Sequence, residues 1–276
     1  MRFGKKTNTV SRIISGLVGL VYLVPLLWIV LTSIKPESAL TSSLVSVAFH
    51  PTVSSYKYIW SMVGIPILRS FEICIPTVII VVVLGILSGY GLANLRDQFG
   101  RRVARIALLA AIILQLVPQA ISVIPLYSVL ASWRLINSIP GVVLADSELL
   151  LPLAILLLWP FVAQVPSELT DAAQIDGAAG RVVLLRIIVP LIKNGVITVA
   201  VFVFCLVWGE FIYAATFINS SDLMPISVIL VDQVGSFQAN WNQLMALATI
   251  SSLPIVLVFL GSQRYIRSGL LIGAFR

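Results

Sequence analysis

Charged side chains divide this chain into long uncharged stretches. The intervals without a charge are 13–34, 73–95, 106–133, 149–167, 194–209 and 233–263. A helix needs about 20 apolar residues to cross a bilayer, and five of these intervals reach that length or come within one residue of it. The interval 194–209 reaches it if Glu210 is accepted near its end and the helix continues over 211–218. The pattern therefore predicts six transmembrane helices.

The same pattern sets where each helix should begin and end. The expected helices cover about 14–33, 72–93, 103–118, 149–163, 195–218 and 245–263. The third interval is too long for one straight span and contains Pro118 and Pro125. A second, shorter helix or re-entrant element should therefore follow Pro118 through Leu126. Residues 134–148 are expected to form an outer loop.

The second expected helix carries a packing signal. Small residues recur at every fourth position of its second half, at Gly85, Gly89 and Ala93. This spacing lets another helix approach closely. The segment before this helix, 37–69, contains several aromatic residues, namely Tyr56, Tyr58 and Trp60. It fits either a short amphipathic piece at the membrane interface or an ordinary loop, and the sequence favours the two equally.

Composition supports the membrane class. Hydrophobic residues make up 59% of the 276 positions and charged residues 11%, whereas a soluble domain carries about 25% charged residues. The mean hydropathy is +1.06. Backbone polar groups in lipid must be satisfied within the segment, which excludes an open sheet, and the alternating pattern of a barrel is absent. We expect an all-α membrane protein in which residues 1–276 form a single transmembrane domain.

Basic residues gather on one side of the expected helices. The net charge is +7, which on its own would suit nucleic-acid binding. However, 14 of the 18 Lys and Arg residues lie before the first helix, between the second and third, between the fourth and fifth, or after the sixth. Cytoplasmic loops carry such an excess, so both termini are expected in the cytoplasm. The charge reflects topology, and no nucleic-acid partner is expected.

The N-terminus has the basic region and the apolar run of a signal peptide. The run is too long and lacks a small-residue cleavage site, so we interpret it as an uncleaved first span. Cys74 and Cys205 lie in apolar spans, where free cysteine behaves as a small hydrophobe. With His50 as the only histidine, these residues do not make a zinc site, so neither a metal nor a disulfide is expected.

One inner loop, 166–193, has built-in structure. Pro166 ends the preceding helix, and the spacing predicts a helix to about Asp176 with paired alanines on one face. Gly177 permits a sharp change of direction, and a second helix is expected over about 179–189. A longish loop with its own helices is usually functional, and this one carries a carboxylate expected to be unpaired. From the residues alone, a docking surface for a soluble partner and a solvated connector are equally favoured.

The loop resembles the EAA loop of ABC importer permeases, which docks on a cytoplasmic ATPase. The family pattern is roughly Glu-Ala-Ala, then Ile-Asp-Gly-Ala, then Ile-x-Leu-Pro. The matching positions are Ala172, Ala173, Ile175, Asp176, Gly177, Ala178, Ile187 and Pro190. Asp171 replaces the glutamate and Val189 replaces the leucine. The resemblance implies that these residues, with Arg186, couple the chain to an ATPase, and that Asp171 pairs with a basic residue of that partner.

Nearly the whole chain also resembles one branch of these permeases, the carbohydrate importers related to the maltose system. The motifs that carry it are Ser-Ile-Lys-Pro at 33–36, Tyr-Gly-Leu-Ala at 90–93, Ile-Pro-Leu-Tyr at 124–127, Trp-Gly-Glu-Phe at 208–211 and Gln-Arg-Tyr at 263–265. The resemblance implies a type I ABC importer (MetI-like) permease fold in the cell membrane of a prokaryote, with a carbohydrate as cargo. The implied partners are a second permease subunit, a cytoplasmic ATPase dimer, an extracytoplasmic solute-binding protein and membrane lipids.

Trp208 and Glu210 are candidates for the translocation pathway. An ionisable group in a span suggests function by default. Glu210, however, lies towards the outer end of its helix, where an interfacial or packing role is favoured. Trp208 could stack on a sugar or anchor at the interface, and the sequence leaves both open.

The chain is expected to be a transport subunit, not an enzyme, and to hold no cofactor. It contains no Gly-x-x-x-x-Gly-Lys-Ser/Thr motif, so nucleotide binding by that route is excluded. An ion-coupled secondary transporter would carry ionisable or unwound positions near the midplane, and the predicted spans have almost none. A membrane-embedded enzyme would need a convergent catalytic set, which the spans lack. An importer permease for peptides or amino acids is the remaining alternative, and only the resemblance to the carbohydrate branch argues against it.

Overall fold

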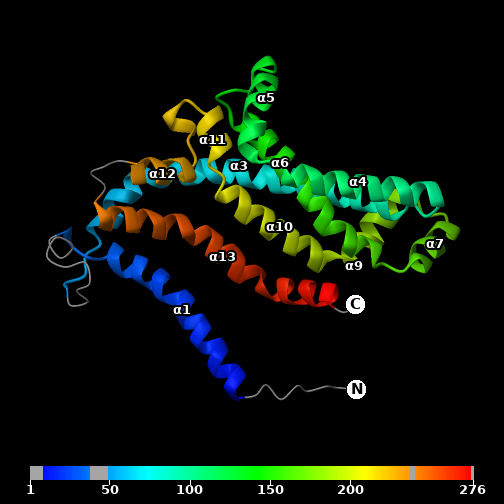
Figure 1. Ribbon diagram of the computed structural model, residues 1–276, viewed down its shortest axis with the longest axis horizontal. Helices are drawn as coiled ribbons and strands as arrows, with labels where there is room; N and C mark the ends of the chain where they lie inside the picture. Colours follow the sequence, from blue (N-terminus) through cyan, green and yellow to red (C-terminus); the bar gives the residue numbers. More distant parts are fainter. Residues whose placement is uncertain (1–8, 38–48, 236–239, 275–276) are drawn as a thin grey trace. The chain divides into compact units, whose positions relative to one another are not determined.

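The computed structural model describes residues 9–37, 49–235 and 240–274, and no strand occurs in these ranges (Figure 1). The longer helices are α1 (Thr9–Ser33), α3 (Ser54–Ala93), α4 (Gln98–Leu116), α5 (Gln119–Ser132), α6 (Ile139–Ala163), α10 (Lys193–Trp208) and α13 (Trp241–Ala274). The shorter ones are α7 (Ser167–Ile175), α8 (Gly180–Val183), α9 (Val189–Leu191), α11 (Ile212–Phe217) and α12 (Ile226–Gly235). A π-helical turn covers Leu184–Ile188 and a 3-10 turn covers Ser221–Leu223. The prediction of an all-α protein is confirmed.

Within the described ranges, four helices are long and apolar enough to cross a membrane: α1, α3, α6 and α13. Two bent pairs meet the same test together: α4 with α5, bent by 100°, and the helical segment Gly180–Leu191 with α10, bent by 79°. Counting each pair as one span gives six, the predicted number. The break near Pro118 is confirmed, although α5 continues to Ser132, past the expected Leu126. The cytoplasmic location of both termini stays a prediction.

Two segments outside the expected spans are largely helical. α3 begins at Ser54, so the aromatic segment around Tyr56 belongs to a helix of 40 residues and is not a loop. α6 begins at Ile139 and not at 149, because Ser138 caps it by accepting a hydrogen bond from the Gly141 N–H at 3.2 Å. Pro140 occupies the first turn, where proline is favoured. The prediction of an outer loop over 134–148 is therefore wrong from residue 139 on.

The boundaries expected for the last two helices are also wrong. α10 ends at Trp208 instead of continuing to 218, and the chain resumes as α11. The Glu210 carboxylate makes this break stable, because it accepts hydrogen bonds from the backbone N–H groups of Tyr213 at 2.9 Å and Ala214 at 3.2 Å. α13 covers residues 241–274 and not 245–263, since a helix can continue beyond the apolar interval that crosses the bilayer.

The chain divides into two compact units, Met1–Gly64 with Leu230–Leu253, and Ile65–Ile229 with Pro254–Arg276. In the first unit, Lys35 is buried, and its Nζ lies 4.9 Å from the ring centroid of Trp28 and 5.5 Å from that of Phe49. Such cation–π contacts stabilise a lysine that is removed from water. The prediction of one domain over residues 1–276 stays a prediction.

In the second unit, α6 is the central helix, and α4, α10 and α11 pack against it (Figure 1). α3 approaches α6 through its small-residue face. A Cβ at Gly85 would lie 2.8 Å from Leu158 Cδ1 and 3.3 Å from Ala154 Cβ. A Cβ at Gly89 would lie 3.4 Å from the Trp159 backbone. The predicted packing role of these glycines is confirmed.

Candidate functional site

The polar segment between α6 and α10 first turns after α7. Gly177 has a φ of +82°, in the left-handed region that glycine enters without steric cost. The Ala178 N–H donates to the Ala173 carbonyl at 2.9 Å, which satisfies one of the free carbonyls at the end of α7. The predicted change of direction at Gly177 is confirmed.

The second helix of this segment runs over Gly180–Leu191 and includes a π-helical turn. Proline has no N–H, so Pro190 cannot donate within the helix, and the Val189 N–H reaches back to the Leu184 carbonyl. Pro190 lies inside this helix and does not end it, contrary to the expected boundary at 189. The bend comes after Leu191, where α10 departs at 79°.

Much of the segment is exposed. The Ile175 side chain is 86% exposed and Leu169 is 46% exposed. The other predicted coupling residues that are exposed are Ala172, Asp176, Gly177, Arg186 and Pro190. Ala173 and Ala178 are half-buried. The structure thus places the predicted coupling residues along one surface segment, and their role in coupling stays a prediction.

Asp171 is paired within the chain. Its two oxygens accept hydrogen bonds from Arg96 Nη1 at 2.7 and 3.0 Å, and Arg96 Nη2 donates to Thr170 Oγ1 at 3.0 Å. The Arg96 and Asp171 side chains remain 47% and 49% exposed. The contact forms because the turn after α3 brings Arg96 beside α7. The pairing of Asp171 with a basic residue of an ATPase stays a prediction.

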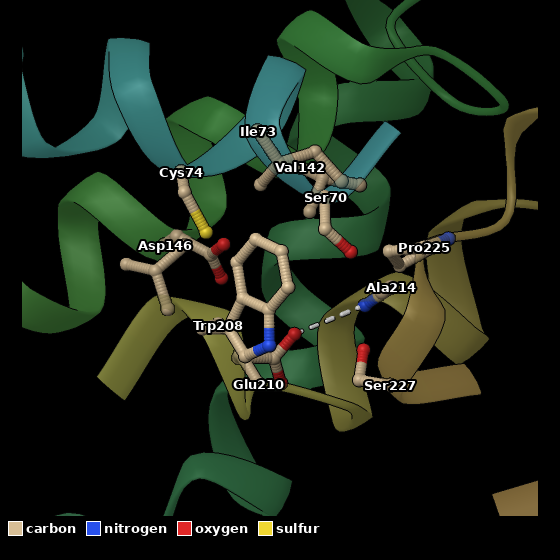
Figure 2. A pocket seen from close by; sticks show the side chains of 11 residues that line it. Ser70, Ile73, Cys74, Val142, Asp146, Trp208, Glu210, Ala214, Pro225 and Ser227 are labelled. Atoms are coloured by element: carbon tan, nitrogen blue, oxygen red, sulfur yellow. Dashed lines mark hydrogen bonds between the residues drawn. The ribbon is translucent and has the colours of Figure 1, made fainter. Parts of the chain in front are cut away.

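A small internal cavity lies where α3, α6, α10 and α11 meet (Figure 2). It encloses about 10 Å³, roughly the space that one water molecule needs. Trp208 and Glu210, the two predicted pathway residues, both line it together with Asp146. Figure 2 shows the Trp208 ring at the centre, with the carboxylates of Asp146 and Glu210 on different sides of it. The structure thus brings the two predicted residues into one site.

Trp208 is held inside the second unit. Its side chain is 4% exposed. The ring packs edge-on against Phe71 with 4.9 Å between centroids and stacks on Phe204 with 5.5 Å between centroids. Of the two interpretations left open, an anchor at the membrane interface is therefore wrong. An aromatic face beside the cavity remains a candidate contact for cargo.

Glu210 joins two helices. Besides the backbone of α11, its Oε1 accepts a hydrogen bond from Gln119 Nε2 at 2.7 Å, and Gln119 begins α5. The carboxylate therefore holds the start of α5 next to the start of α11, as the favoured packing role requires.

Sequence reasoning misses Asp146, because it takes a charge as the end of an apolar interval. Asp146 lies in α6, is 1% exposed, and neither carboxylate oxygen has a hydrogen-bond partner among the described residues. A buried polar group without a partner is costly, and an ionisable group in a span is a functional candidate by default. The signal that could have found it is the Ser-Ile-Pro helix start at 138–140.

Up to six spans within the described residues, with a structured polar segment exposed between α6 and α10, define a multi-pass membrane protein. Residues 81–271 match the family described as binding-protein-dependent transport system inner membrane component. The chain belongs to this family and is a permease subunit of the ABC importer type. The resemblance seen in the EAA-like loop is confirmed at the level of the family.

Named relatives match over most of their length. The chain is 28% identical to the sulfoquinovosyl glycerol transport system permease protein SmoH of Agrobacterium fabrum, over 92% of this chain and 89% of that protein. It is 29% identical to the trehalose transport system permease protein SugB of Mycobacterium tuberculosis, over 99% of both. A bacterial ABC transporter involved in the import of the acidic polysaccharide alginate contains a chain of the same fold, with a TM-score of 0.78 at 16% identity, covering 96% of this chain and 99% of that one.

Proposed function

We propose that this permease carries a carbohydrate, that is, a sugar, an oligosaccharide or a related polyol, and forms half of the pathway through the membrane. The observation that supports this most strongly is the full-length similarity to permeases named for trehalose and sulfoquinovosyl glycerol. Both names denote sugar compounds rich in hydroxyl groups. The other half of the pathway would come from a second permease subunit, and an extracytoplasmic binding protein would deliver the cargo.

The cavity around Trp208 has side chains that suit it as a binding site for the cargo. An aromatic face and a carboxylate with free acceptor sites are the groups that suit a sugar ring and its hydroxyls, and Trp208 and Asp146 supply one each. At about 10 Å³ the cavity is too small for a sugar. The proposal therefore requires α10 to move away from α6 during transport.

The segment 166–193 would supply that movement by docking on a separate ATPase, since the sequence has no phosphate-binding loop of its own. A nine-residue helix such as α7 is too short to be stable alone, and its exposed Ile175 and Leu169 suit burial by a partner. Motion of the docked α7 would pass through Gly177 and α8–α9 to α10. Two sites, the ATPase contact and the cavity, would thus be coupled.

Reconstitution in proteoliposomes tests the cargo and the partners together. The chain would be combined with the permease, ATPase and binding protein encoded beside it, and uptake of radiolabelled trehalose and of the binding protein's own ligand would be followed. We expect uptake that requires ATP and every subunit and that sugars, but not peptides or amino acids, inhibit. Uptake without the ATPase, or inhibition by peptides alone, would contradict the proposal.

A pair of glycines tests the coupling segment. Alanine at Gly177 would be forced into left-handed geometry at a cost of about 1–2 kcal/mol. Gly180, three residues on, has no atom within 4 Å of an added Cβ and begins α8 with an ordinary φ, so Gly180→Ala is the matched control. We expect Gly177→Ala to reduce uptake and stimulated ATPase activity at an unchanged amount of protein in the membrane. Equal activity of the two variants would refute the role of Gly177.

A further inference from the structure

A groove on the surface of the second unit is lined by arginine side chains at one end and by aliphatic side chains along the rest of one wall. It encloses about 530 Å³ between the end of α3, one face of α4 and the end of α6. Arg96, Arg101 and Arg105 line one end of it, and Leu108, Leu109 and Ile112 line the rest of the α4 wall. The groove is much larger than the cavity beside Trp208, and it is open to the surroundings.

The groove follows directly from the sequence of α4. Positions 101, 105, 108, 109 and 112 have the spacing i, i+4, i+7, i+8 and i+11, so they share one face of the helix. Along that face the chemistry changes from guanidinium to aliphatic within two turns. Arg105 and Ile112 are seven residues apart, or about 10 Å along the axis. Trp159 and Ala163 of α6 form the facing wall.

The charge at the basic end is not neutralised by nearby acids. Asp171 is paired with Arg96, and the Asp97 carboxylate accepts from the Gly100 N–H and caps α4. Arg101 donates to the Arg96 carbonyl, which is uncharged. Arg105 forms no ion pair within the part of the chain that the structure describes. Three guanidinium groups against the two carboxylates of Asp97 and Asp171 leave a net positive charge at the mouth of an apolar groove.

We propose that this groove binds an anionic phospholipid. The phosphate lies between Arg101 and Arg105, and an acyl chain lies along Leu108, Leu109 and Ile112. The groove is at the end of the unit that carries α7, which the distribution of basic residues assigns to the cytoplasmic leaflet. Basic pockets between transmembrane helices on that side are known to suit anionic headgroups. The inference concerns the membrane-facing surface and does not depend on the identity of the cargo.

Lipid retention tests the site. The full-length chain would be purified with its copurifying partners, and native mass spectrometry would count bound phosphatidylglycerol and phosphatidylcholine after exchange at equal concentrations. We expect phosphatidylglycerol to be retained and phosphatidylcholine not. In Arg101→Gln with Arg105→Gln, retention should fall roughly 30-fold, at about fivefold for each basic residue removed. Arg102→Gln is the matched control, since Arg102 is exposed on the same helix but does not line the groove.

Further measurements separate the possible occupants. Leu109→Trp fills the groove without changing its charge and should also displace the lipid, and circular dichroism confirms that each variant folds. Inorganic phosphate at the same concentration should not compete, because it lacks the acyl chain. Leu109→Cys labelled with a benzophenone should crosslink to lipid. Equal retention of the two lipids, equal loss in Arg102→Gln, competition by phosphate, or crosslinking of Leu109→Cys to a protein subunit would overturn the proposal.

Discussion

The ion pair between Arg96 and Asp171 should hold α7 against the turn that follows α3. The perturbation is Arg96→Gln, which removes the charge and leaves a shorter polar side chain. It breaks the contacts of 2.7 and 3.0 Å to the carboxylate and the contact of 3.0 Å to Thr170 Oγ1. α7 is then attached mainly through its two ends, so its local opening becomes easier.

The size of the effect follows from exposure. Both side chains are about half exposed, at 47% and 49%, so water screens the pair and its contribution is about 0.5–1 kcal/mol. The bond to Thr170 brings the total to about 1–1.5 kcal/mol. This corresponds to a change of roughly fivefold to tenfold in the opening equilibrium.

Amide hydrogen exchange over α7 measures that equilibrium. We expect protection of residues 171–175 to fall roughly fivefold to tenfold in Arg96→Gln and roughly twofold to fivefold in Asp171→Asn, which keeps the bond to Thr170. The double variant should lose no more than Arg96→Gln. High salt should reduce the protection of the native chain and leave the variants unchanged. Additive losses, or no loss in Arg96→Gln, would show that the pair does not hold α7.

Three other substitutions test the packing of the second unit by thermal unfolding in detergent. Asp146→Leu should raise stability by about 1–3 kcal/mol, because it removes a buried carboxylate without a partner; a lower melting temperature would reveal a partner. Glu210→Ala should cost about 1–2 kcal/mol by freeing the start of α11, and Glu210→Gln less, because the amide oxygen still accepts; equal losses would show that an uncharged acceptor does not hold α11. Gly85→Val should cost about 1–3 kcal/mol where α3 meets α6, whereas Gly91→Val, with no atom within 4 Å, should be tolerated.

The spans could be predicted from sequence because each is defined by a local property. Pro118 breaks its helix wherever it is placed, and Gly177 turns the chain because of its own backbone freedom. The EAA-like loop could likewise be located, since its motif is contiguous.

The rest depends on contacts between distant residues. Arg96 and Asp171 are 75 positions apart, and nothing local indicates which basic residue meets that carboxylate. The break after Trp208 requires Glu210 to reach both α11 and Gln119, 91 residues away. The sequence predicts a loop at Asp146 because charge alone does not distinguish the end of a span from a buried position within it.

The bend at Ile192 joins a short helical arm, Gly180–Leu191, to a longer arm, α10, so that the two arms can rotate together as one rigid lever. With 16 residues, that arm is about 24 Å long, so tilting the short arm by about 10° would swing the indole at its tip through about 4 Å. A displacement of that order is comparable to the thickness of a sugar ring. A small rotation of the segment Gly180–Leu191 would therefore give a larger displacement of Trp208 at the far end of α10. The cavity could widen for cargo in this way without any helix unwinding.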